Sequence, residues 1–148
     1  MYNKLNLIIL TKSGNIVLRN AIVYSYEKSV FTNGCSFINI PTGAFEDTAK
    51  IVQEYILKTF SIPCGNVKII ETRKQIMDPD KPFHAICRIN SELEPLLINE
   101  NYRNYFKNCD PNNLPLMETY EKNKLEQFIH DGTFDDVLLP EESNEISL

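Results

Sequence analysis

The chain has 148 residues, which is the usual size of one domain, and 43% of them are apolar and 24% charged. This composition is typical of a globular protein with its own core, and it excludes a disordered chain. The net charge is −5, and Lys and Arg form no cluster in the sequence. Nucleic acid is therefore not expected as a partner, although a small phosphorylated ligand stays open.

The spacing of the cysteines and the apolar run near the N-terminus indicate in which cellular compartment the protein is expected. The cysteines form no C-x-x-C pair and have no His at ligand spacing, so we expect reduced thiols rather than a zinc site. The run Leu5–Leu10 is too short to span a membrane. We therefore expect a protein of the cytoplasm, or of another reducing compartment, with no membrane partner. The cysteines are Cys35, Cys64, Cys87 and Cys109.

The first third of the chain is predicted to form β-hairpins. Apolar and β-branched runs alternate with turn signals, first at Lys12–Asn15 and again at Asn33-Gly34. Pro41 is expected to end the last of these strands, because proline cannot donate a hydrogen bond to a sheet. The predicted strands cover residues 5–10, 16–18, 21–26 and 36–40.

An amphipathic helix is predicted at about residues 47–60. Asp47 or Thr48 can cap its first free N–H groups, and Pro63 and Gly65 end it. Its apolar side chains recur at helical spacing and define one buried face, opposite a face of charged and amide side chains. The apolar face consists of Ile51, Val52, Tyr55, Ile56, Thr59 and Phe60, and the polar face of Lys50, Gln53, Glu54 and Lys58.

The second half adds a hairpin and helices. Strands are predicted at Val67–Met77 and Phe83–Ile89, joined by the turn-forming segment 78–82, and a short helix at Glu100–Lys107. A longer helix is predicted at about 117–130, with Tyr120, Leu125, Phe128 and Ile129 inward and Gly132 after its end. We expect an α+β domain over residues 1–135, whose mixed sheet is covered by the two long helices. Residues 136–148 are predicted to be an acidic, loosely packed tail.

The segment before the first long helix resembles the signature of the Nudix hydrolase superfamily. That signature reads Gly-x5-Glu-x7-Arg-Glu-U-x-Glu-Glu-x-Gly-U, where U is aliphatic. Residues 40–46, Ile-Pro-Thr-Gly-Ala-Phe-Glu, resemble its beginning, and residues 53–62 fall on its end. The resemblance covers roughly residues 4–132 and implies a Nudix-like mixed sheet with 47–60 as the central helix.

The match to this signature is degenerate at the positions that carry chemistry. Only Glu54 remains of the family's carboxylates on the helix, because Leu57 and Lys58 stand where paired glutamates are expected. Gln53 replaces the arginine, and Phe60 replaces the glycine. The loop after Gly43 is about four residues shorter than the family spacing, so the middle glutamate has no clear counterpart.

These replacements bear directly on metal binding. Family members cleave a phosphoanhydride of nucleoside diphosphate derivatives with divalent metals, and Mg²⁺ prefers carboxylate and water oxygens. Positions 54, 57 and 58 share one face of a helix, but here they offer one carboxylate, one isobutyl group and one ammonium. We therefore expect no cofactor, with Mg²⁺ or Mn²⁺ only if the protein is active. Glu54 would then be the catalytic and metal-binding residue, and otherwise the partner of Lys58 in a helix salt bridge.

The resemblance also suggests a ligand cleft. It assigns Gly43, Glu46, Asp47, Gln53 and Lys58 to this cleft, with His84 on a strand that borders it. Simpler interpretations remain open. Carboxylates at the start of a helix usually interact favourably with the positive end of the helix dipole, and a single His more often has a structural role. The aromatic run Tyr102, Tyr105 and Phe106 suits core packing better than base stacking.

Three functions follow from these residues. The first is a Nudix-fold protein without hydrolytic activity that binds a nucleotide-like ligand or a protein partner. The second is an active pyrophosphohydrolase that uses displaced carboxylates such as Glu46, Asp47 and Glu54. The third is a non-enzymatic adaptor of another fold, such as the longin-like type. A homodimer is also compatible with the family resemblance.

Overall fold

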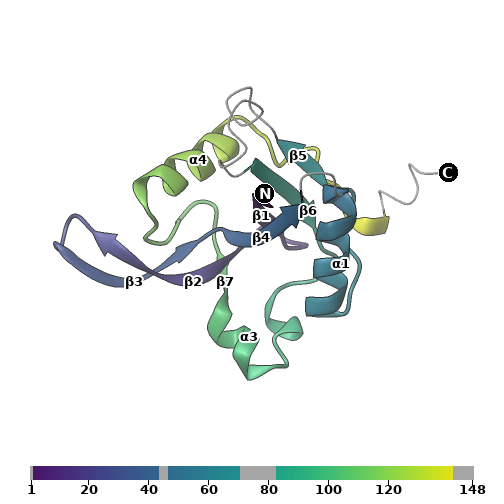
Figure 1. Ribbon diagram of the computed structural model, residues 1–148, viewed down its shortest axis with the longest axis horizontal. Helices are drawn as coiled ribbons and strands as arrows, with labels where there is room; N and C mark the ends of the chain where they lie inside the picture. Colours follow the sequence, from purple (N-terminus) through teal and green to yellow (C-terminus); the bar gives the residue numbers. More distant parts are fainter. Residues whose placement is uncertain (1, 44–46, 71–82, 142–148) are drawn as a thin grey trace.

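The computed structural model describes residues 2–43, 47–70 and 83–141 (Figure 1). This part of the chain is a mixed α+β structure with one seven-stranded mixed sheet. Its strands are β1 (Tyr2–Leu10), β2 (Ile16–Ser25), β3 (Val30–Ser36), β4 (Ile38–Gly43), β5 (Lys68–Ile70), β6 (Phe83–Arg88) and β7 (Phe106–Cys109). Its α-helices are α1 (Thr48–Phe60), α3 (Glu100–Tyr105) and α4 (Thr119–His130), and Glu94–Leu96 forms a 3-10 turn.

Strand β1 lies at the centre of the sheet. It runs parallel to β6 and antiparallel to β2 and β4. The main order is β3-β2-β1-β6-β5, while β4 pairs with β1 and β7 pairs with β2. Successive side chains of a strand point to opposite faces, so β1 contributes to two cores, with Leu5 and Leu7 in one and Ile8 in the other. All three are fully buried, which explains why the continuous run Leu7–Leu10 of this strand is apolar on both faces.

Helix α1 covers one face of the sheet. Val52, Ile56 and Phe60 are buried against the core that contains Leu5 and Leu7 of β1. Asp47 is the N-cap, and its carboxylate accepts a hydrogen bond from the backbone N–H three residues later at 3.3 Å. The predicted helix at 47–60, its cap and its buried face are thus confirmed.

Helix α4 covers the opposite face. Leu125 and Phe128 pack in the second core with Phe37 and Ile86. The predicted inward position of Tyr120 is wrong, because 60% of this residue is exposed. It belongs to the first turn of α4, which lies beside a pocket rather than over the core. Gly132 follows the helix with a φ of 69°, as its predicted place requires.

The turn predicted at Asn33-Gly34 is also wrong, because both residues lie inside β3. The chain reverses earlier, before Val30, where Ser29 has a φ of 56°. Gly34 serves close packing instead. A Cβ at this position would lie 2.5 Å from the carbonyl oxygen of Leu116. The segment before α4 therefore approaches the backbone of β3 more closely than any side chain would allow.

Pro41 does not end a strand as predicted. It lies within β4 opposite Lys4 of β1, and β4 continues to Gly43. In the part of the chain that is described, β4 pairs with β1 and with no other strand. A proline is tolerated there because its missing N–H is not needed on the unpaired edge.

The C-terminal elements differ from the prediction in two ways. The helix predicted at Glu100–Lys107 ends at Tyr105, and the chain continues directly as β7. The segment assigned to the loose tail contributes to the core, because Val137 is 2% exposed. Asp136 also forms an ion pair with Lys68 at 2.8 Å. Residues 71–77 of the predicted strand lie outside the described residues.

Candidate functional site

The predicted cleft residues on α1 lie on its solvent side. Gln53, Glu54 and Lys58 are exposed, and Leu57 is 57% exposed. The expected Glu54–Lys58 salt bridge is not formed, since the ion pairs among the described residues are Lys68–Asp136 and His130–Asp131. An exposed pair on a helix gains only a few tenths of a kcal/mol and must order two flexible side chains. Leu57 on this face is an apolar side chain that α1 does not bury.

Two other predicted residues border the start of α1. Gly43 is the last residue of β4, and Asp47 is the N-cap of α1, which supports the structural interpretation of this carboxylate. Glu46 lies outside the described residues. Within the described ranges, no group of three His, Cys, Asp or Glu side chains could hold a metal ion. The four cysteines are free thiols, and Cys35 is in hydrogen-bond contact with Cys109.

His84 is separated from these residues by the sheet. It is 1% exposed and lies on the α4 side, with its ring between those of Phe37 and Phe128, at centroid distances of 5.3 Å in both cases. Burial lowers the pKa of His84 to about 4, and the positive charge of Lys124 acts in the same direction. The imidazole is therefore neutral near pH 7. The structure does not bring His84 together with Glu54 and its neighbours.

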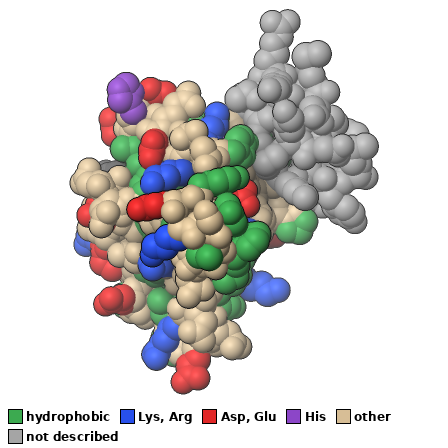
Figure 2. Space-filling view, turned by 90° about the vertical axis from the view of Figure 1, so that its left-hand side faces the viewer, with side chains coloured by type: hydrophobic (Ala, Val, Ile, Leu, Met, Phe, Trp, Pro, Cys, Tyr) green, Lys and Arg blue, Asp and Glu red, His purple; other side chains and the backbone are tan. Residues whose placement is uncertain are grey.

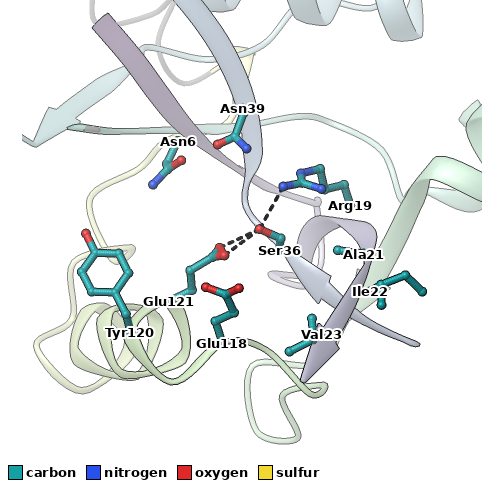
Figure 3. Close-up of a pocket in the computed structure, with 10 residues that line it drawn as sticks. All are labelled: Asn6, Arg19, Ala21, Ile22, Val23, Ser36, Asn39, Glu118, Tyr120 and Glu121. Atoms are coloured by element: carbon teal, nitrogen blue, oxygen red, sulfur yellow. Dashed lines mark hydrogen bonds between the residues drawn. The ribbon is translucent and has the colours of Figure 1, made fainter. Parts of the chain in front are cut away.

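A different set of polar residues meets on the α4 side of the sheet. They line a pocket of about 520 Å³ beside the first turn of α4, a size within the usual range for small-molecule sites. Figure 3 shows the amides of Asn6 and Asn39 on one side of it and the carboxylates of Glu118 and Glu121 on the other. The pocket is lined by Asn6, Arg19, Ala21, Ile22, Val23, Ser36, Asn39, Glu118, Tyr120 and Glu121.

One wall of this pocket is a hydrogen-bonded network that joins β2, β3 and α4. The carboxylate of Glu121 accepts the single hydroxyl hydrogen of Ser36, with Oγ lying 2.7 and 2.8 Å from its two oxygens, and the N–H of Phe37 at 2.9 Å. Arg19 donates from Nε to the carbonyl oxygen of Phe37 at 2.8 Å and from Nη2 to Oγ of Ser36 at 3.2 Å. Because charge-assisted bonds of this kind are directional, the network holds α4 at a defined height above the sheet.

The opposite wall is formed by Asn6 and Asn39, which belong to a row of polar side chains across three strands. Asn39 of β4 lies opposite Asn6 of β1, and Asn6 lies opposite His84 of β6. Asn6 is 5% exposed, and Nδ2 of its amide lies 3.5 Å from Nε2 of His84. That is the one side-chain hydrogen bond of Asn6 to another described residue, and it is long. The amide of Asn6 therefore makes fewer hydrogen bonds than its donors and acceptor allow. The remaining ones are available to a ligand in the pocket.

Sequence reasoning missed this pocket, although a signal was present. Asn6 and Asn39 interrupt apolar runs, as Leu5-Asn6-Leu7 and Ile38-Asn39-Ile40. A polar residue inside a buried strand needs a partner, so each asparagine was a candidate site residue. No comparable signal marks Glu118, which is one of several exposed charged residues near α4.

No family model matches this chain, and no curated protein matches it significantly. No helix in the described residues is both long enough and apolar enough to span a bilayer. The site is therefore assessed on its own geometry.

Proposed function

We propose that this chain is a Nudix-like protein that binds a nucleotide-like ligand without hydrolysing it. Two features support the proposal. The helix that would hold the metal in the family pattern presents Glu54 with Leu57 and Lys58, which cannot together coordinate Mg²⁺. A separate pocket on the other side of the sheet carries the amide and carboxylate groups that recognise a polar heterocycle.

The observation that carries this proposal is the pocket that contains Asn6. Its polar groups come from four strands and one helix, so they are held by the fold rather than by a loop. Arg19 and Ser36 position Glu121, and this arrangement leaves the volume between Asn39 and α4 open. A polar, preformed cavity of this size favours binding of a small molecule.

The test combines binding with turnover. The full chain would be unfolded thermally with a panel of nucleosides and of nucleoside mono-, di- and triphosphates, each with and without Mg²⁺ or Mn²⁺. Binding to the native state raises the melting temperature by mass action. We expect a rise with at least one compound, independent of metal, and no phosphate release. Metal-dependent phosphate release that Glu54→Gln abolishes would instead establish the active hydrolase.

A second candidate function, self-association, is favoured by the β2–β3 hairpin. This hairpin projects from the body in Figure 1, and Figure 2 looks onto the same end and shows hydrophobic side chains gathered there. Ile22, Tyr26 and Phe31 are 66%, 78% and 72% exposed. Apolar side chains concentrated on one projecting element are typical of a protein interface.

The edge of β3 is suited to pairing with a second copy. The N–H of Cys35 points away from β2 and donates to Leu116 at 2.8 Å. Alternate residues of an antiparallel strand direct their backbone groups to the same side, so those of Phe31 and Asn33 also point outward. Two copies can pair there around a two-fold axis. Sedimentation of the wild type and of Phe31→Ser tests this, with Tyr120→Ser as the control. We expect the wild type and Tyr120→Ser to form a dimer and Phe31→Ser to dimerise more weakly. A wild type that stays monomeric at all concentrations would exclude self-association.

A further inference from the structure

We propose that the pocket beside α4 recognises a guanine base, and that Glu118 is the residue that selects it. This inference rests on the proposed function, because it names the chemical class of ligand for the same site. It depends on three features of the pocket: an uncommitted carboxylate, two amides opposite it, and an aromatic ring at the rim.

Glu118 is the carboxylate that is available to a ligand. It is the residue before α4, and its side chain makes no capping hydrogen bond to the helix. Among the described residues no partner holds it, whereas Glu121 is engaged by Ser36 and Phe37. Figure 3 shows the Glu118 carboxylate directed toward the same space as that of Glu121. An ionised carboxylate accepts hydrogen bonds on two oxygens and donates none, so it requires a ligand edge with N–H donors.

Guanine is the common base that meets this requirement. Its N1–H and N2–H₂ groups are adjacent donors and match the two oxygens of a carboxylate. Adenine and cytosine present an amino group beside an unprotonated ring nitrogen, whose lone pair would face the second oxygen. Uracil presents one N–H between two carbonyl groups. Each of these bases would leave part of the carboxylate unpaired or repelled, which is how hydrogen-bonding sites reject near analogues.

The opposite side of the pocket complements the remaining groups of guanine. The side-chain amides of Asn6 and Asn39 can donate to O6 and N7, which are acceptors. Tyr120 at the rim offers an aromatic face for a base to stack on, and Ala21 and Val23 supply apolar surface on another side. The volume of about 520 Å³ admits a nucleoside. No phosphate contact is needed, and the two carboxylates disfavour a polyphosphate inside the pocket.

The experiment is calorimetric titration of the full chain, without metal, with guanosine, adenosine, cytidine and uridine. Guanosine should bind at least tenfold more tightly than the other three. Glu118→Gln replaces one carboxylate oxygen by a donor and should weaken guanosine binding at least tenfold. Glu126→Gln, an exposed glutamate of the same helix outside the pocket, is the matched control and should leave the affinity unchanged. Tyr120→Ala should weaken binding of guanosine without changing the preference.

The outcomes separate this inference from the proposed function. Equal binding of all four nucleosides, or equal affinities of Glu118→Gln and Glu126→Gln, would overturn the guanine assignment. Displacement of guanosine by arginine at similar concentration would also overturn it, because the site would then recognise a cation. If another nucleotide raises the melting temperature and guanosine does not, the inference fails and the proposed function stands. Metal-dependent phosphate release would defeat the proposed function whatever the base preference.

Discussion

Ser36, the last residue of β3, donates its hydroxyl hydrogen to the carboxylate of Glu121 in the first turn of α4, with oxygen–oxygen distances of 2.7 and 2.8 Å. Because an ionised carboxylate only accepts hydrogen bonds, the hydroxyl donates to it, while the same Oγ accepts from Arg19. These residues are far apart in the sequence, at positions 19, 36 and 121. These hydrogen bonds therefore connect β2, the end of β3 and the first turn of α4, and together they form one wall of the pocket.

Replacement of Glu121 by alanine should destabilise the protein by about 2 kcal/mol. The change removes charge-assisted hydrogen bonds and leaves the N–H of Phe37 and the hydroxyl of Ser36 without their acceptor. Urea unfolding would measure the free energy of unfolding of Glu121→Ala against Glu126→Ala, a control on the exposed side of α4. Equal stability of the two variants would show that the network does not hold α4 in solution.

Stability should fall in mild acid because of His84. Its pKa is about 4 in the folded state and about 6.5 when unfolded. Below pH 6.5 the unfolded chain therefore binds the proton more readily, so stability is full above that pH and is lost as the pH falls toward 4. At 1.36 kcal/mol per pKa unit, the loss amounts to roughly 3 kcal/mol.

Urea unfolding between pH 7 and pH 4 would measure this loss. Carboxylates also titrate in the lower part of the range, so the comparison is with His84→Gln, whose side chain stays neutral. The variant should show a smaller decrease of the free energy of unfolding between pH 6.5 and pH 5. The same pH dependence in both proteins would contradict the assignment to His84.

A methyl group at Gly34 should be costly. Its Cβ would lie 2.5 Å from the carbonyl oxygen of Leu116, which belongs to the backbone and cannot turn away like the end of a side chain. Either the segment before α4 shifts or the sheet edge does, and we expect a loss of about 1–3 kcal/mol for Gly34→Ala. Thermal unfolding should show a clear drop in melting temperature, while Asn33→Ala, an exposed neighbour, should stay near the wild type.

Introducing carboxylates on α1 should create a metal site. Positions 54, 57 and 58 share one helix face, so the double variant Leu57→Glu and Lys58→Glu would place two carboxylates beside Glu54 and remove a positive charge. Mn²⁺ binding followed by electron paramagnetic resonance should be stronger in this variant than in the wild type. A variant carrying Leu57→Gln and Lys58→Gln controls for the loss of the ammonium alone. Tight Mn²⁺ binding by the wild type would contradict our interpretation of α1.

The local sequence determined much of the secondary structure. Asp47 and the spacing of Val52, Ile56 and Phe60 predicted α1 almost to the residue, because capping and helical periodicity depend on neighbours a few positions apart. The apolar runs at residues 5–10 and 83–89 likewise predicted β1 and β6. Where prediction was wrong, at Gly34, Pro41 and Tyr120, a distant segment decided the outcome.

Only the tertiary structure decided which residues meet. The family resemblance placed His84 beside a predicted cleft with residues of α1, but its side chain points to the other face of the sheet, toward Phe37 and Phe128. The pairing of β1 with β4 and with β6 aligns Asn6 between Asn39 and His84, and the start of α4 brings Glu118 across from the two asparagines. Strand register over such separations depends on the packing of two whole cores. Local periodicity shows that a strand is buried and leaves its neighbours open.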